Sequence, residues 1–160
     1  MANQILEALL PGATSGIRPG GQCVDPAAFK AACHHAARAV AGRVARFEPE
    51  HSPYTSYLYA VLALPGCHVA VLCNRAYPLL AFSGDPDGLY MTRRYVDEPA
   101  LAAAFEEVPP FHALLASALS CPPSAVSLDA LSEPEQANVR YWIRYGRLEQ
   151  AGDLLFNDWD

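Results

Sequence analysis

The sequence has no long hydrophobic run. Its longest apolar run extends from Tyr57 to Leu64 and ends at Pro65-Gly66, whereas a membrane-spanning helix needs about 20 apolar residues. The N-terminal residues lack the basic region that opens a signal peptide. We therefore expect no membrane span and a cytoplasmic location.

Charged side chains are scarce, and Lys30 is the only lysine. Charged residues make up 18% of the chain and hydrophobic residues 52%, which indicates a folded protein and not a disordered one. A net charge of −6 argues against duplex nucleic acid as a partner, because duplex DNA binders present a basic surface. With 160 residues, we expect a single α+β domain spanning residues 1–160.

The common catalytic and cofactor motifs are missing. The sequence contains no Gly-x-Gly-x-x-Gly, Walker loop, His-Glu-x-x-His or Gly-x-Ser-x-Gly. Five cysteines, an odd number, favour free thiols over disulfides. Cys33-His34-His35 is no metal site on a helix, since consecutive helical residues diverge by about 100°. We predict no metal and no cofactor.

The apolar pattern predicts an α+β fold: a four-stranded antiparallel meander with one long N-terminal helix and several C-terminal helices. Asp25 and Pro26 suit the start of the long helix, whose apolar stripe continues to Phe47. Turn residues separate the expected strands. These strands are 56–64, 67–73, 76–83 and 89–96, and a short helix is expected at 2–10.

Prolines and one cap divide the remaining third of the chain. A helix is expected from Pro99, and Pro109-Pro110 should end it and start another helix that continues to Leu119. Ser132 and Glu135 form a capping box ahead of residues 138–145. The apolar spacing within 138–145 fits a helix and, nearly as well, a strand. We expect Trp159 to pack on the domain.

Alternation along the strands sorts their side chains onto two faces. Two-residue turns would pair Ala63 with His68, and His68 with Ala81. One face is apolar and should pack against the long helix. The other combines aliphatic side chains with tyrosine hydroxyls and a guanidinium, and tyrosine and arginine are enriched at binding hot spots. It is a candidate binding surface unless the C-terminal helices cover it; its leading residues are Tyr59, Tyr77, Arg93 and Tyr95.

Charge is distributed unevenly along the chain. Residues 1–47 hold five bases and two acids, giving +3, whereas residues 48–160 hold six bases and 15 acids, giving −9. Lys30, His34 and Arg38 line one face of the long helix and should meet water. We predict a small non-catalytic binding or regulatory protein with a protein partner, acting through the tyrosine-bearing sheet face or this basic helix face.

An alternative function rests on one cysteine and one histidine. Cys23 stands just ahead of the long helix, and His68 lies at the start of a strand, which is the order of a papain-like thiol–imidazole pair. Gly21-Gln22-Cys23 and the segment 66–71 resemble pieces of the CHAP and NlpC/P60 cysteine amidases, which cut peptidoglycan amide bonds. The resemblance implies Cys23 as nucleophile and His68 as base. In this alternative Asp85 could orient His68 only through the turn that holds it.

Overall fold

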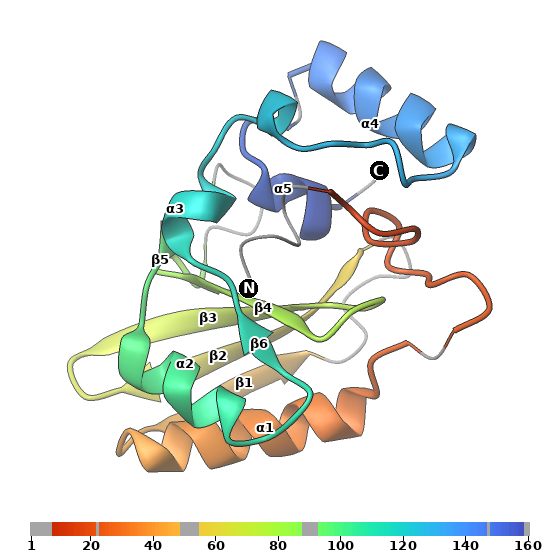
Figure 1. Ribbon diagram of the computed structural model, residues 1–160. Helices are drawn as coiled ribbons and strands as arrows, with labels where there is room; N and C mark the ends of the chain where they lie inside the picture. Colours follow the sequence, from red (N-terminus) through yellow and green to blue (C-terminus); the bar gives the residue numbers. More distant parts are fainter. Residues whose placement is uncertain (1–7, 22, 49–54, 88–92, 147, 159–160) are drawn as a thin grey trace.

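A six-stranded sheet lies between two groups of helices in the computed structural model, which describes residues 8–21, 23–48, 55–87, 93–146 and 148–158 (Figure 1). The α+β prediction is confirmed, with two strands more than expected. Five strands follow one another in antiparallel order, and β6 pairs in parallel with β4. The strands are β1 (Arg43–Glu48), β2 (Tyr57–Leu64), β3 (Cys67–Asn74), β4 (Leu79–Ser83), β5 (Tyr95–Val96) and β6 (His112–Ala113).

The long N-terminal helix, α1 (Pro26–Ala39), is shorter than predicted. The Asp25 side chain caps it by accepting a hydrogen bond from the backbone N–H of Ala27. The helix ends where Ala41 adopts a φ of 57°, a left-handed conformation that a helix cannot continue. Residues 43–47, predicted as helix, belong to the edge strand β1 instead.

Gly42 allows this change from helix to strand. A Cβ at this position would lie 2.6 Å from the carbonyl oxygen of Ala63 in β2, so the close approach of the two backbones requires glycine. A register shift between Val44 and Arg46 marks a bulge in β1. Because of this bulge, Val44 and Phe47 both pack on the α1 side of the sheet.

The first predicted hairpin is confirmed, and the second differs. Ala63 pairs with His68 across the β2–β3 turn, as expected. In the next pair Leu72, and not His68, lies opposite Ala81. The register has moved by four residues, which is an even number, so every side chain keeps its predicted face.

Asn74 is the cause of that shift. Its side-chain oxygen accepts hydrogen bonds from the backbone N–H groups of Ala76 and Tyr77 at 3.0 and 3.1 Å. These two residues are therefore held in a loop, and Pro78 has no N–H to offer a ladder. The strand predicted from Ala76 begins at Leu79.

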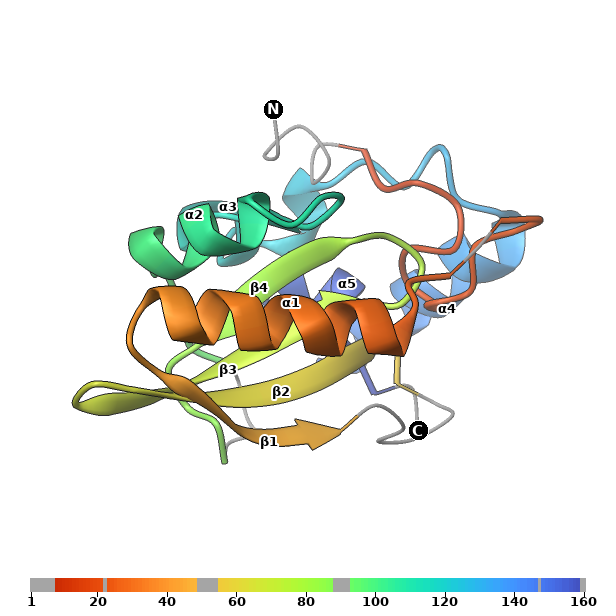
Figure 2. The same ribbon diagram turned by 90° about the horizontal axis from the view of Figure 1, so that it is seen from below.

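The two sheet faces pack against different parts of the chain. Helices α1 and α2 (Pro99–Glu106) cover one face, which holds the apolar residues predicted to form the core (Figure 2). The C-terminal elements α3 (Ala116–Leu119) and α5 (Gly152–Leu155) cover the other face. Buried side chains under α1 and α2 include Leu58, Leu62, Val69, Val71, Leu80 and Phe82.

The C-terminal third differs from prediction in one element and resolves an open choice in another. The single helix expected to reach Leu119 is interrupted by β6, because the N–H of His112 donates to Pro78 O and extends the sheet. Residues 138–145 lie in the helix α4 (Glu133–Arg144) and its C-cap, and the capping box of Ser132 and Glu135 is present. The chain also forms a short 3-10 helix, η2 (Pro123–Ala125).

Some predictions fall on parts of the chain outside the described residues. These are most of the helix expected at 2–10, the strand residues 89–92, and Trp159. Within the described ranges, no helix has both the length and the apolar character to cross a membrane.

Candidate binding surfaces

The structure does not bring Cys23 and His68 together. The backbone N–H of Val24 donates to Arg75 O at 2.8 Å, which places Cys23 beside the C-terminal end of β3. His68 lies at the other end of that strand. Since strand residues advance by about 3.3 Å each, these two side chains are separated by roughly 20 Å. This separation is far beyond the hydrogen-bond reach that a nucleophile and its base require.

Asp85 does not complete such a site either. Its carboxylate pairs with Arg94 at 3.4 Å on the surface. The register of β3 with β4 places it at the His68 end of the sheet, away from Cys23. Among the described residues, no group of three His, Cys, Asp or Glu side chains is arranged to hold a metal ion.

The tyrosine-bearing sheet face is covered by the chain itself. Tyr59 and Tyr95 are buried, with exposed fractions of 1% and 6%. The Tyr59 hydroxyl donates to Pro86 O. Tyr77 is half-buried in the β3–β4 loop, and its hydroxyl donates to Pro11 O at 2.8 Å. The candidate surface formed by these tyrosines is therefore an internal contact, because C-terminal apolar residues pack on it.

Arg93 joins this face to the C-terminal segment. Its guanidinium donates to Phe156 O and, at 2.9 Å, to the Tyr57 hydroxyl, over whose ring it also lies. The Tyr57 hydroxyl in turn donates to the Asp158 carboxylate at 3.3 Å. Arg93 and the tyrosines predicted beside it thus hold the two layers together.

Tyr95 and Asp153 form the second half of this network. The Tyr95 hydroxyl donates to Asp153 at 3.2 Å. Burial raises the pKa of Tyr95, and it also raises the pKa of Asp153 although backbone N–H groups and Arg93 oppose that rise. For Arg93, burial alone would lower the pKa, but the surrounding tyrosines and aspartates raise it. The guanidinium therefore stays charged inside the protein.

The basic helix face is exposed. Lys30, His34 and Arg38 all lie on the solvent side of α1, as predicted for this face. Arg43, the first residue of β1, projects to the other side of the sheet, because its neighbour Val44 packs on the α1 side. We call Lys30, His34 and Arg38 the basic face. Part of the role of Arg38 is local, since a cation in the last turn stabilises a helix.

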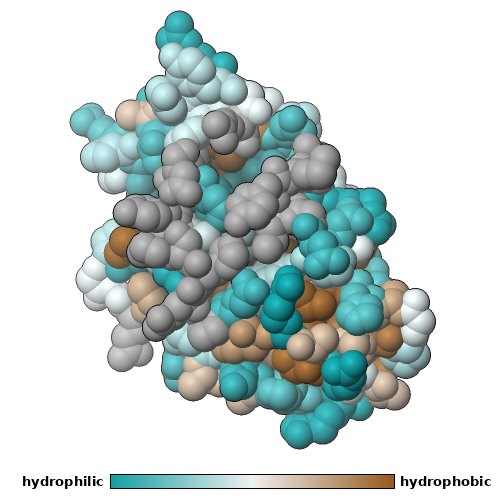
Figure 3. All heavy atoms as spheres, turned by 180° about the vertical axis from the view of Figure 1, so that it is seen from behind, coloured by the Kyte–Doolittle hydropathy of each residue, from teal (hydrophilic) through white to brown (hydrophobic). Residues whose placement is uncertain are grey.

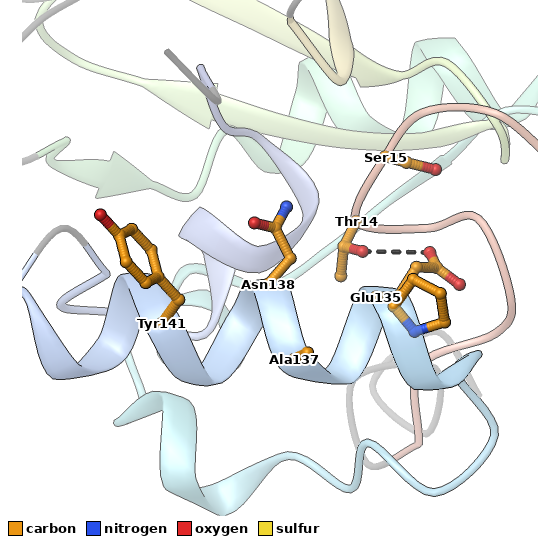
Figure 4. A pocket seen from close by; sticks show the side chains of 7 residues that line it. Thr14, Ser15, Glu135, Ala137, Asn138 and Tyr141 are labelled. Atoms are coloured by element: carbon orange, nitrogen blue, oxygen red, sulfur yellow. Dashed lines mark hydrogen bonds between the residues drawn. The ribbon is translucent and has the colours of Figure 1, made fainter.

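An open groove of about 570 Å³ lies between α4 and the loop that precedes α1. Figure 4 shows Asn138 and Tyr141 projecting from α4 on the side where Thr14 and Ser15 lie. We call this the α4 groove. Its lining residues are Thr14, Ser15, Pro134, Glu135, Ala137, Asn138 and Tyr141.

Glu135 fixes one end of the α4 groove. One carboxylate oxygen accepts hydrogen bonds from the Gly12 N–H at 2.9 Å and the Thr14 hydroxyl at 3.1 Å. The other accepts from the backbone N–H and the hydroxyl of Ser132. Both oxygens are thus occupied by the chain, and the groove presents no other charged side chain. Pro134, Ala137 and the Tyr141 ring can contact apolar groups of a ligand, and Thr14, Ser15 and Asn138 add polar groups to the lining.

Two exposed tyrosines extend the groove along α4. Tyr141 and Tyr145 are 53% and 62% exposed, and their ring centroids lie 4.6 Å apart. Val139 is buried in the core, and the partly buried Trp142 packs against the same cluster. The outward stripe therefore lies on a helix that is packed against the core. It consists of Pro134, Ala137, Asn138, Tyr141 and Tyr145, spaced for one helix face.

Sequence reasoning did not single out this stripe. The spacing of Val139 and Trp142 identified the inward face of α4, if the segment was a helix. Tyr141 and Tyr145, four residues apart, then had to point elsewhere. The signal was present, but it depended on choosing helix over strand for this segment. Comparison with protein-family models, curated proteins and solved structures finds no match to this chain.

Proposed function

We propose that this protein is a non-catalytic binding protein that receives an apolar segment of a protein partner in the α4 groove. The observation that carries the proposal is the pair of exposed tyrosines at that groove, whose rings contact one another. Tyrosine is enriched at binding hot spots because it buries a large area while losing little conformational freedom.

The geometry of α4 supports binding with little rearrangement. The capping box of Ser132 and Glu135 fixes the start of the helix, and the Glu135 bonds fix the loop across the groove. Tyr141 also contacts the half-buried Trp142 edge-to-face, with ring centroids 5.3 Å apart. A preformed site loses less entropy on binding than a mobile one.

Two further observations support the non-catalytic and cytoplasmic parts of the proposal. The thiol and imidazole that an amidase would need lie at opposite ends of β3. All five cysteines are free, which is typical of a reducing compartment.

Peptide display tests the proposal. The immobilised protein selects binders from a random peptide library, and each binder is then measured against the double variant Tyr141→Ala, Tyr145→Ala. We expect selected peptides rich in apolar residues, with affinity reduced by about tenfold or more in the variant, as for hot-spot truncation.

A matched variant controls for the loss of exposed apolar surface in general. Leu10 and Leu115 are 44% and 48% exposed and do not line the α4 groove. Leu10→Ala, Leu115→Ala should bind the selected peptides as the parent does. The proposal would be refuted by an equal loss of peptide affinity in both variants. It would also be refuted if the selected peptides bound the Tyr141→Ala, Tyr145→Ala variant as tightly as the parent protein.

A further inference from the structure

We infer that the basic face binds an acidic segment of a protein partner, at a second surface separate from the α4 groove. The inference is independent of the proposed function of that groove. In Figure 1, α4 lies at the top of the molecule and α1 at the bottom.

The cations of the basic face have no acidic partner among the described residues. Lys30 and Arg38 take part in no ion pair there, whereas His35 pairs with Glu107, Arg46 with Glu48 and Arg94 with Asp85. Residues 1–47 carry +3 in a protein of net charge −6. An exposed cationic surface on an acidic protein attracts an acidic group.

The spacing of the cations fits a short extended segment. Lys30, His34 and Arg38 follow one another at four-residue steps along the exposed side of α1. Lys30 and Arg38 are therefore about 12 Å apart along the helix axis, which about four extended residues span.

Apolar side chains beside the cations favour a protein segment over nucleic acid. Val44 and Phe47 of β1 are only half-buried, and Lys30 lies 5.6 Å from the centroid of the Phe47 ring. Figure 3 shows hydrophobic side chains coming to the surface among hydrophilic ones in the lower part of the reverse face. Residues 48–160 carry −9 and would repel a long polyanion that extends past the basic face.

Fluorescence anisotropy with a labelled, glutamate-rich peptide containing a few leucines tests the inference. We expect saturable binding at low salt that weakens as salt is raised. Lys30→Glu, Arg38→Glu should reduce the affinity by at least about tenfold, because it removes two attractive charges and adds two repulsive ones.

Arg140→Glu, Arg144→Glu on α4 makes the same change in net charge at the other end of the molecule and should leave peptide binding within about twofold. Circular dichroism confirms that both variants fold. Equal loss in both variants would overturn the inference, because binding would then follow net charge alone. It would also be overturned by no binding at low salt, or by tighter binding of a single-stranded oligonucleotide of equal charge. Concentration-dependent self-association that Lys30→Glu, Arg38→Glu abolishes would instead assign the face to a second copy of this chain and contradict the inference.

Discussion

Asn74 connects three parts of the molecule through one buried amide. Its nitrogen donates to Ala13 O and Leu155 O, both at 2.8 Å, and its oxygen accepts from the two loop N–H groups that follow β3. The residue is fully buried. All four hydrogen-bonding positions of the amide are therefore used, and no other side chain of similar size offers two donors and one oxygen in this arrangement.

Replacing Asn74 by alanine should therefore destabilise the protein strongly. Asn74→Ala leaves two carbonyls and two N–H groups without their partner, and we expect the free energy of unfolding to fall by about 3 kcal/mol. Urea denaturation measures this change. Asn138→Ala, on the exposed side of α4, should cost less than about 0.5 kcal/mol. Similar losses in the two variants would show that the buried amide has no special role.

At the scale of elements, the C-terminal segment, residues 148–158, packs on the sheet face that α1 and α2 do not cover. Ser56 binds it on both sides, since its hydroxyl donates to Leu155 O and its N–H donates to Asn157 O. Arg93 and Tyr57 add the charged part of the contact. Burial raises the pKa of Tyr57 to about 12, although Arg93 opposes that rise. Between about pH 10 and about pH 12, Tyr57 therefore stays protonated in the folded protein, whereas its hydroxyl ionises in the unfolded chain.

This pKa predicts an alkaline loss of stability. In the unfolded chain Tyr57 ionises near pH 10, whereas in the folded protein its pKa is about 12. Its contribution is fully present below about pH 10 and is lost as pH rises through the folded pKa, at a rate approaching about 1.4 kcal/mol per pH unit. Urea denaturation at about pH 9 and about pH 11 should show the fall.

Tyr57→Phe provides the comparison for this pH dependence. The variant lacks the ionisable hydroxyl, so its stability should fall less over the same pH interval. Tyr59 and Tyr95, whose pKa values burial also raises, still contribute to the remaining slope. An unchanged slope in Tyr57→Phe would contradict the assignment of a buried, raised hydroxyl to this residue.

The sequence predicted the structure correctly where the apolar residues fitted a single spacing. It was misleading where the same residues fitted both a helix and a strand. Strict alternation predicted the faces of β2 and β3, and the face assignment survived the β3–β4 shift because that shift is even. Val44 and Phe47 fitted a helix at three- and four-residue steps, but they also fit a bulged strand. The left-handed Ala41 that separates these alternatives carries no recognisable local signal.

The candidate sites were limited by a different problem. Periodicity placed Tyr59 and Tyr95 on one face, but whether that face meets water depends on contacts with residues 148–158, far along the chain. Conversely, Cys23 and His68 were predicted to form a pair only because they occur in the same order as the thiol and imidazole of papain-like enzymes. The hydrogen bond from the Val24 N–H to Arg75 O instead places Cys23 at the far end of β3 from His68. The basic face was predictable because it depends on one helix alone.

At the scale of the whole molecule, the two proposed surfaces lie at opposite ends. The α4 groove is uncharged apart from a saturated carboxylate, and the basic face is cationic. The proposed ligands therefore differ in chemistry, and we expect neither to compete with the other. The sheet between the two surfaces is covered on both faces, with Tyr59 and Tyr95 used for internal contacts.

Nitration of tyrosines in the folded protein, mapped by mass spectrometry, tests this arrangement most directly when done with and without a saturating display-selected peptide. The account predicts that Tyr141 and Tyr145 react in the free protein and are protected by the peptide. Tyr57, Tyr59 and Tyr95 should remain unmodified in both samples. Reaction of Tyr59 and Tyr95 as fast as Tyr141, or unchanged reaction of Tyr141 and Tyr145 with the peptide bound, would contradict the account.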